Sequence, residues 1–89
     1  MKLKYKKWDV FITKEKYNNG RICLLLRDAE TGQPLTKATT NIPHLFLRED
    51  EVAIKDYSEN EGMLDWLEEN EIVEPKGEYE GHPIARLLV

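Results

Sequence analysis

The feature that most constrains the fold is an Asn-Gly turn between two strand-like segments. Asn18-Asn19-Gly20 separates residues 7–17 from residues 21–27. Asn-Gly favours a tight hairpin because both residues accept the positive φ angles of a type I′ turn. A turn centred on Asn-Gly pairs Tyr17 with Ile22 and predicts a mostly apolar hairpin face: Phe11, Thr13, Tyr17, Ile22, Leu24 and Leu26. We expect residues 21–27 to lie in the centre of the sheet and the lysine-bearing residues 7–17 at its edge.

Three further segments after the hairpin predict strands. A turn over residues 28–34 leads to residues 35–42, which alternate so that Thr36, Ala38, Thr40 and Ile42 lie on one side. Residues 51–56 predict a short strand, and the apolar residues 83–89 would be exposed unless they joined the sheet. Glu74-Pro75-Lys76-Gly77 is expected to be a turn or loop. The predicted class is α+β, in the order ββββαβ, with about five mainly antiparallel strands in one sheet and one helix packed on a face.

The helix is predicted between the fourth and fifth strands. Ser58 and Glu61 have the Ser-x-x-Glu spacing of a capping box. On a helical wheel the apolar residues fall on one arc: Met63, Leu64, Trp66 and Leu67. The opposite arc is entirely acidic: Glu61, Asp65, Glu68 and Glu69. Because Ile72 would fall among the acids, we expect the helix to end near Asn70 and the chain to turn back toward the core.

Length and composition narrow the class of protein. The chain has 89 residues, of which 40% are hydrophobic and 34% charged, which predicts one folded domain over residues 1–89 with little room for a deep substrate cleft. The single cysteine, Cys23, cannot form an internal disulfide and is expected to be a core residue of an apolar strand. No segment resembles a signal peptide or a membrane span, so we expect a cytoplasmic protein.

The charge is strongly divided along the chain. Residues 1–27 carry eight Lys/Arg and two Asp/Glu, whereas residues 28–89 carry five and fifteen. The overall charge of −4 makes nucleic acid an unlikely partner in general. The four acids of the predicted helix have no lysine on their face, and each like-charge pair costs about 0.2–0.5 kcal/mol. Such a face either only solvates the helix or docks a basic protein, which makes four residues the candidate partner-binding site: Glu61, Asp65, Glu68 and Glu69.

The inventory of catalytic and metal-binding groups is small. The sequence has none of the common phosphate-loop, zinc or hydrolase motifs. The one serine, Ser58, is assigned to the helix cap, and His44 and His82 are expected to be solvated or capping. Asp56, Ser58 and Asn60 match the first three ligand positions of an EF-hand calcium loop, but the required Gly and Glu each come one residue late. We therefore predict no catalytic residue, no cofactor and no metal site.

Residues 51–64 resemble the signature of an uncharacterised domain-of-unknown-function family. The signature reads Glu-Val-Ala-Ile-Lys-Asp-Tyr-Ser-Glu-Asn-Glu-Gly-Met-Leu, and the wider resemblance spans roughly residues 20–88. It includes the strand at 22–27 and several residues that follow it: Thr31-Gly32, Pro34, Ala38-Thr39 and Asn41. Members of the family are small single-domain proteins carried on conjugative elements, plasmids and phages of bacteria. The resemblance implies no catalytic residue, only a mobile-element setting in which small acidic proteins are often inhibitors or adaptors.

The leading hypothesis is a non-enzymatic accessory protein that contacts a protein with a basic surface through its acidic helix face, as a monomer or weak dimer. A first alternative is a nucleic-acid mimic that inhibits a host defence or DNA-processing enzyme. A second alternative is direct nucleic-acid binding through the basic N-terminal strand. There Lys4, Lys6 and Lys7 alternate with possible stacking rings, Tyr5 and Trp8, and Tyr17 follows further along.

Overall fold

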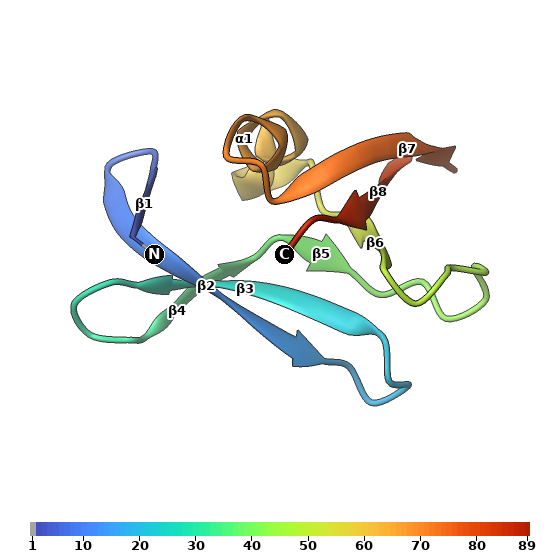
Figure 1. The fold of residues 1–89 in the computed structure, drawn as a ribbon, viewed down its shortest axis with the longest axis horizontal. Helices are drawn as coiled ribbons and strands as arrows, with labels where there is room; N and C mark the ends of the chain where they lie inside the picture. Colours follow the sequence, from blue (N-terminus) through green and yellow to red (C-terminus); the bar gives the residue numbers. More distant parts are fainter. Residues whose placement is uncertain (1) are drawn as a thin grey trace.

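The computed structural model describes residues 2–89 as two four-stranded antiparallel sheets and one α-helix (Figure 1). The first sheet has the order β1-β2-β3-β4: β1 (Leu3–Tyr5), β2 (Trp8–Lys16), β3 (Ile22–Asp28) and β4 (Pro34–Lys37). The second sheet has the order β5-β6-β8-β7: β5 (Thr39–Thr40), β6 (Glu51–Ile54), β8 (His82–Leu87) and β7 (Val73–Tyr79). A short 3₁₀ helix, η1 (Ser58–Asn60), precedes the helix α1 (Met63–Glu69). The α+β class is confirmed, whereas a single sheet of five strands in the order ββββαβ was wrong.

The two sheets meet at Ala38, which divides the predicted strand 35–42 into β4 and β5. The Ala38 N–H donates to the Leu24 carbonyl in β3, and the Ala38 carbonyl accepts from the Lys55 N–H beyond β6, both at 2.9 Å. One extended segment therefore pairs first with one sheet and then with the other. This crossing lets the sheets enclose a shared core with α1 over one side, next to the start of β7 (Figure 1). The largest fully buried apolar side chains come from both sheets and the helix: Val10, Leu24, Leu26, Val52, Ile54, Met63, Leu67 and Val73.

The first hairpin forms as predicted, but its register differs by one residue. Lys16, not Tyr17, pairs with Ile22, because the connection is a three-residue loop that ends on Gly20 at φ 84°. The Tyr17 N–H donates to the Arg21 carbonyl at 2.8 Å, which closes the loop. A three-residue loop with a left-handed last residue is the other common use of such a turn. Since side chains alternate, the shift turns Val10 and Ile12 toward the core, in place of Phe11 and Thr13.

The edge prediction for residues 7–17 is also wrong in part. β2 lies between β1 and β3, so it is not an edge strand of the sheet. However, β1 pairs only with Trp8–Val10, and the lysine-bearing second half of β2 extends beyond it. Lysine protects that exposed half from pairing with another chain.

β7 and β8 form a second hairpin that the sequence did not predict. Residues 74–77, expected to be a turn or loop, form part of β7. The turn lies at Glu80-Gly81, whose φ angles of 49° and 83° fit a two-residue hairpin between Tyr79 and His82. A bulge between Pro75 and Gly77 interrupts the register. Proline is compatible with this strand because β7 is the last strand of its sheet.

The helix begins with a different cap from the predicted capping box. The Asp56 carboxylate accepts from the Gly62 N–H through Oδ1 and from the Leu64 N–H through Oδ2, both at 2.8 Å. Ser58 lies instead in η1, with a left-handed φ of 57°. Asp56 therefore binds two of the amides that the start of a helix leaves without a partner.

The helix ends where the sequence predicts, at Asn70. Glu71 then adopts φ 58°, its N–H donates to the Glu68 carbonyl, and the Ile72 N–H donates to the Leu67 carbonyl at 2.9 Å. These two hydrogen bonds define a Schellman motif. Ile72 is buried beyond it, as expected.

Asp56→Ala should lower the free energy of unfolding by about 1–2 kcal/mol, because the two amides lose their acceptor. Ser58→Ala should change it by less than about 0.5 kcal/mol, since the Ser58 side chain caps nothing. Urea denaturation followed by circular dichroism measures both changes. A larger loss in Ser58→Ala than in Asp56→Ala would restore the predicted capping box.

Candidate functional site

The acidic surface predicted from the sequence is exposed. Asp65, Glu68 and Glu69 are exposed on α1, and Glu61 is exposed directly before it. Within residues 2–89 none of these four carboxylates takes part in an ion pair. We call these four residues the acidic face.

The helix that carries the acidic face is held firmly despite its seven residues. The Trp66 Nε1–H donates to the Lys4 carbonyl of β1 at 2.7 Å. The Trp66 ring packs edge-to-face on Tyr5, with 5.1 Å between the ring centroids. Met63 and Leu67 are fully buried beneath. Since an isolated helix this short is unstable in water, these contacts and the Asp56 cap maintain it.

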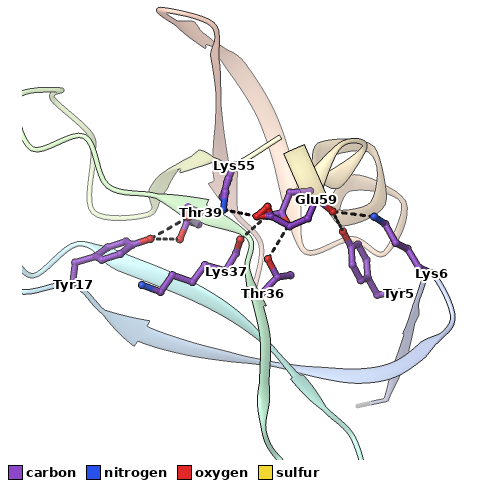
Figure 2. A network of polar contacts seen from close by, with 9 residues as sticks. Tyr5, Lys6, Tyr17, Thr36, Lys37, Thr39, Lys55 and Glu59 are labelled. Atoms are coloured by element: carbon purple, nitrogen blue, oxygen red, sulfur yellow. Dashed lines mark hydrogen bonds and ion pairs between the residues drawn. The ribbon is translucent and has the colours of Figure 1, made fainter. Parts of the chain in front are cut away.

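A polar network lies beside η1 (Figure 2) and centres on Asn60, which is 0% exposed. The Asn60 Nδ2 donates to the Lys37 carbonyl at 2.6 Å, and its Oδ1 accepts from the Thr36 hydroxyl at 2.8 Å. The Asn60 side chain thus provides a hydrogen-bond donor for the Lys37 carbonyl, at the outer edge of β4. It also joins the segment before α1 to the first sheet.

Asn60→Ala should lower the free energy of unfolding by about 2–4 kcal/mol, because it leaves the Lys37 carbonyl and the Thr36 hydroxyl without their partner and opens a small cavity. Asn18→Ala makes the same substitution at an exposed loop residue and should change stability by less than about 0.5 kcal/mol. Urea denaturation of the two variants tests this. Equal urea midpoints for the Asn60→Ala and Asn18→Ala variants would show that the buried Asn60 side chain contributes nothing to stability.

Tyr17 forms the other end of the network. Its hydroxyl lies 2.9 Å from the Thr39 hydroxyl and donates to the Thr39 carbonyl at 3.1 Å. Burial, together with the neighbouring Cys23 thiol, raises the pKa of Tyr17 to about 12. The hydrogen bond with Thr39 acts in the opposite direction but is the smaller effect. The fold therefore favours the neutral phenol.

Tyrosine ionisation at 295 nm should include a late component near pH 12 that is missing in Tyr17→Phe. Because the folded pKa is raised, the stability that Tyr17 contributes is complete below pH 10 and is lost as the pH rises through the folded pKa. Tyr57→Phe, at an exposed ring, should retain the late component. An unchanged titration in Tyr17→Phe would contradict the assignment.

Two hollows border the network and share Thr36. One, of about 210 Å³, is lined by Tyr5, Lys6, Trp8, Leu35, Thr36 and Glu59. The other, of about 420 Å³, is lined by Tyr17, Lys37, Lys55 and Tyr57 together with hydroxyl and amide groups: Thr36, Thr39, Thr40 and Asn41. The surface that lines the first hollow is mainly apolar, and the surface that lines the second is mainly polar.

Lys6, Lys37 and Lys55 line these hollows, and each of them, like Lys7 beside the first hollow's Trp8, lies near an aromatic ring. The distances from Nζ to the ring centroid are 5.5 Å for Lys6 and Tyr5, 5.2 Å for Lys7 and Trp8, 5.7 Å for Lys37 and Tyr17, and 5.7 Å for Lys55 and Tyr57. These separations are in the range of cation–π contacts. Three of these pairs join residues one or two positions apart, whereas Lys37 and Tyr17 are distant in the sequence and meet only in the fold.

Glu59 is the acidic side chain that lines these hollows. Its carboxylate pairs with Lys55 at 2.8 Å, and this bond holds the pKa of Glu59 below its ordinary value. The Lys6 Nζ donates to the Glu59 backbone carbonyl at 2.9 Å, so Lys6 remains without an ion-pair partner within residues 2–89.

The N-terminal strand does not present its lysines and aromatic rings on one surface. Lys4 pairs with Asp9 at 3.6 Å, and Tyr5 is buried under Trp66. Tyr17 is half-buried and lies with Lys37 of β4 rather than with the first lysines. Trp8 alone of these three aromatic residues is substantially exposed, at 38%.

The remaining candidate groups do not converge. His44 packs near Tyr79 and His82 near Tyr57, each with 6.0 Å between ring centroids. Asp56 and Asn60, two of the possible calcium ligands, bind the helix amides and β4 respectively. Within residues 2–89 no three His, Cys, Asp or Glu residues are grouped so that they could hold a metal ion. Cys23 is buried in β3, as expected for a core residue.

Comparison with known proteins finds no family model, curated protein or solved structure that matches this chain. The resemblance to a mobile-element family thus stays a prediction. In the part of the chain that the structure describes, no helix is both long and apolar enough to cross a membrane.

Proposed function

We propose that this chain is a non-enzymatic, cytoplasmic accessory protein of the mobile-element or phage type, which binds a protein with a basic surface through the acidic face. The observation that carries the proposal is that Glu61, Asp65, Glu68 and Glu69 are all exposed and without ion pairs within residues 2–89. Five acids elsewhere in residues 2–89 do have ion-pair partners: Asp9, Glu15, Asp50, Glu59 and Glu74.

Physical chemistry favours a basic partner for such a face. Like charges one helical turn apart repel each other, and lysines or arginines of a partner relieve that repulsion. The helix is already fixed by its contacts with Tyr5 and Lys4, so little conformational entropy is lost when a partner binds. Long-range attraction between opposite charges also speeds association and makes it sensitive to salt.

The nucleic-acid mimic is a particular form of this proposal. If the partner is a defence or DNA-processing enzyme, the acidic face occupies its phosphate-binding groove and acts as an inhibitor. Competition separates the two forms, because DNA displaces a mimic from its partner and leaves a neutral adaptor in place.

The test is partner capture from extracts of the source cells, after nuclease treatment and at low and high salt. The wild type should retain a protein that is released at high salt. The variant Asp65→Lys/Glu68→Lys/Glu69→Lys should bind that protein at least about tenfold more weakly, as measured with the purified partner.

The matched control is Glu30→Lys/Glu78→Lys/Glu80→Lys, which makes the same change in net charge at exposed acids outside the helix. It should bind like the wild type, and circular dichroism should show that both variants are folded. Equal weakening in the two variants would assign the effect to net charge and contradict a role for the acidic face.

A further inference from the structure

We propose that the two hollows form one binding site for single-stranded nucleic acid, distinct from the acidic face. We call the site the lysine–aromatic track and define it by six residues: the lining residues Lys6, Trp8, Lys37, Lys55 and Tyr57, and Lys7, which lies over the Trp8 ring. The proposal does not depend on the proposed protein partner, since it concerns other residues.

The track is continuous although its residues come from distant parts of the chain. Thr36 lines both hollows and so joins them. Figure 2 shows Tyr17 and Lys37 to one side of Thr36, and Tyr5 and Lys6 to the other. The crossing at Ala38 brings Lys37 of β4 beside Lys55, which follows β6. A strand laid over Thr36 would meet both hollows in succession.

The exposed rings of the track provide surfaces on which bases stack. Tyr57 is 46% exposed and Trp8 is 38% exposed, one at each hollow. Tyr5 and Tyr17 are more buried and form walls of the hollows. Stacking on aromatic rings is the main sequence-independent attraction between proteins and unpaired bases.

The lysine Nζ atoms lie over the rings, 5.2–5.7 Å from their centroids, so a base would stack on the part of the ring that the lysine leaves open, with its phosphate near the Nζ. Glu59 offsets the charge of Lys55. Within residues 2–89, Lys6, Lys7 and Lys37 have no ion pair, so no paired carboxylate competes with a phosphate for them. The overall charge of −4 is a sum over the whole chain, whereas at physiological salt a phosphate responds to charges within about 8 Å.

The polar lining favours nucleic acid over an acidic peptide. The hollow at Tyr57 is lined by the half-buried side chains of Thr36, Thr40 and Asn41, whose polar atoms suit sugar, phosphate and base edges. Thr39 is buried, and its hydroxyl already bonds Tyr17. A peptide would need an apolar pocket at each end of the track for its affinity, and only the hollow at Trp8 is mainly apolar in its lining. The site also differs from the predicted N-terminal surface, because Lys4 is paired with Asp9 and plays no part.

Fluorescence anisotropy with a labelled oligothymidine of about 12 nucleotides tests the proposal. The affinity should fall with salt, with a slope of log K against log salt of about −2 for three phosphate contacts. Trp8→Ala and Tyr57→Ala should each weaken binding about tenfold. Lys37→Gln should make the slope shallower by about 0.7.

Matched controls lie outside the track. Phe46→Ala removes a more exposed ring, and Lys16→Gln removes a lysine of β2 that neither lines a hollow nor lies over one of the four rings. Both should bind like the wild type. Equal loss in the controls, or no binding at about 100 μM protein in low salt, would overturn the proposal.

Two further measurements complete the test. Amide and indole chemical shifts of the wild type should change on oligothymidine addition at Trp8, Lys37, Lys55 and Tyr57, which needs no folded variant. A labelled polyglutamate peptide should bind far more weakly than the oligonucleotide. Polyglutamate binding of equal affinity that is insensitive to Trp8→Ala and Tyr57→Ala would reassign the surface to acidic peptides and overturn the proposal.

Discussion

The arrangement of the whole molecule depends on the backbone of Ala38, which hydrogen-bonds to both sheets. Because Ala38 pairs with Leu24 on one side and Lys55 on the other, the residues before it belong to the first sheet and those after it to the second. The polar network attaches to the same segment, through Thr36 and Lys37 to Asn60 and through Thr39 to Tyr17. The crossing therefore fixes the position of η1, and with it the start of α1, relative to the first sheet.

The helix illustrates how tertiary contacts outweigh local preferences. Its seven residues include three acids without ion pairs in the described chain, and two of them lie in the last turn, where the helix dipole opposes negative charge. Packing of Met63 and Leu67, the bond from Trp66 to β1, and the Asp56 cap compensate for this. Unfavourable surface charge that is held in place by buried contacts is typical of a surface selected for something other than stability.

The sequence was informative where a local signal allowed one solution. The Asn-Gly turn predicted the first hairpin, and helical periodicity predicted both the exposure of the acidic face and the end of the helix at Asn70. It failed where two local solutions compete: Asn18-Asn19-Gly20 supports either a two- or a three-residue loop, and the choice shifts the register by one residue. Pro75 and Gly77 suggested a turn, although an edge strand also accepts them. Of the lysine–aromatic track, the sequence indicated only Lys6, Lys7 and Trp8. Their association with Lys37, Lys55 and Tyr57 could not be predicted, because the members lie up to 51 positions apart, from Lys6 to Tyr57, and meet through the crossing at Ala38.

The division of charge along the sequence is therefore only partly a division in space. Of the five basic residues in 28–89, Arg86 and Lys76 pair with acids of the second sheet, whereas Lys37 and Lys55 lie beside aromatic rings at the junction of the sheets. There they join Lys6 and Lys7 from the basic N-terminal segment. The fold thus collects lysines from both halves of the sequence in one place and leaves the acids of α1 unneutralised in another. The acidic face and the lysine–aromatic track share no residue, so substitutions in one test its proposed role without altering the residues of the other.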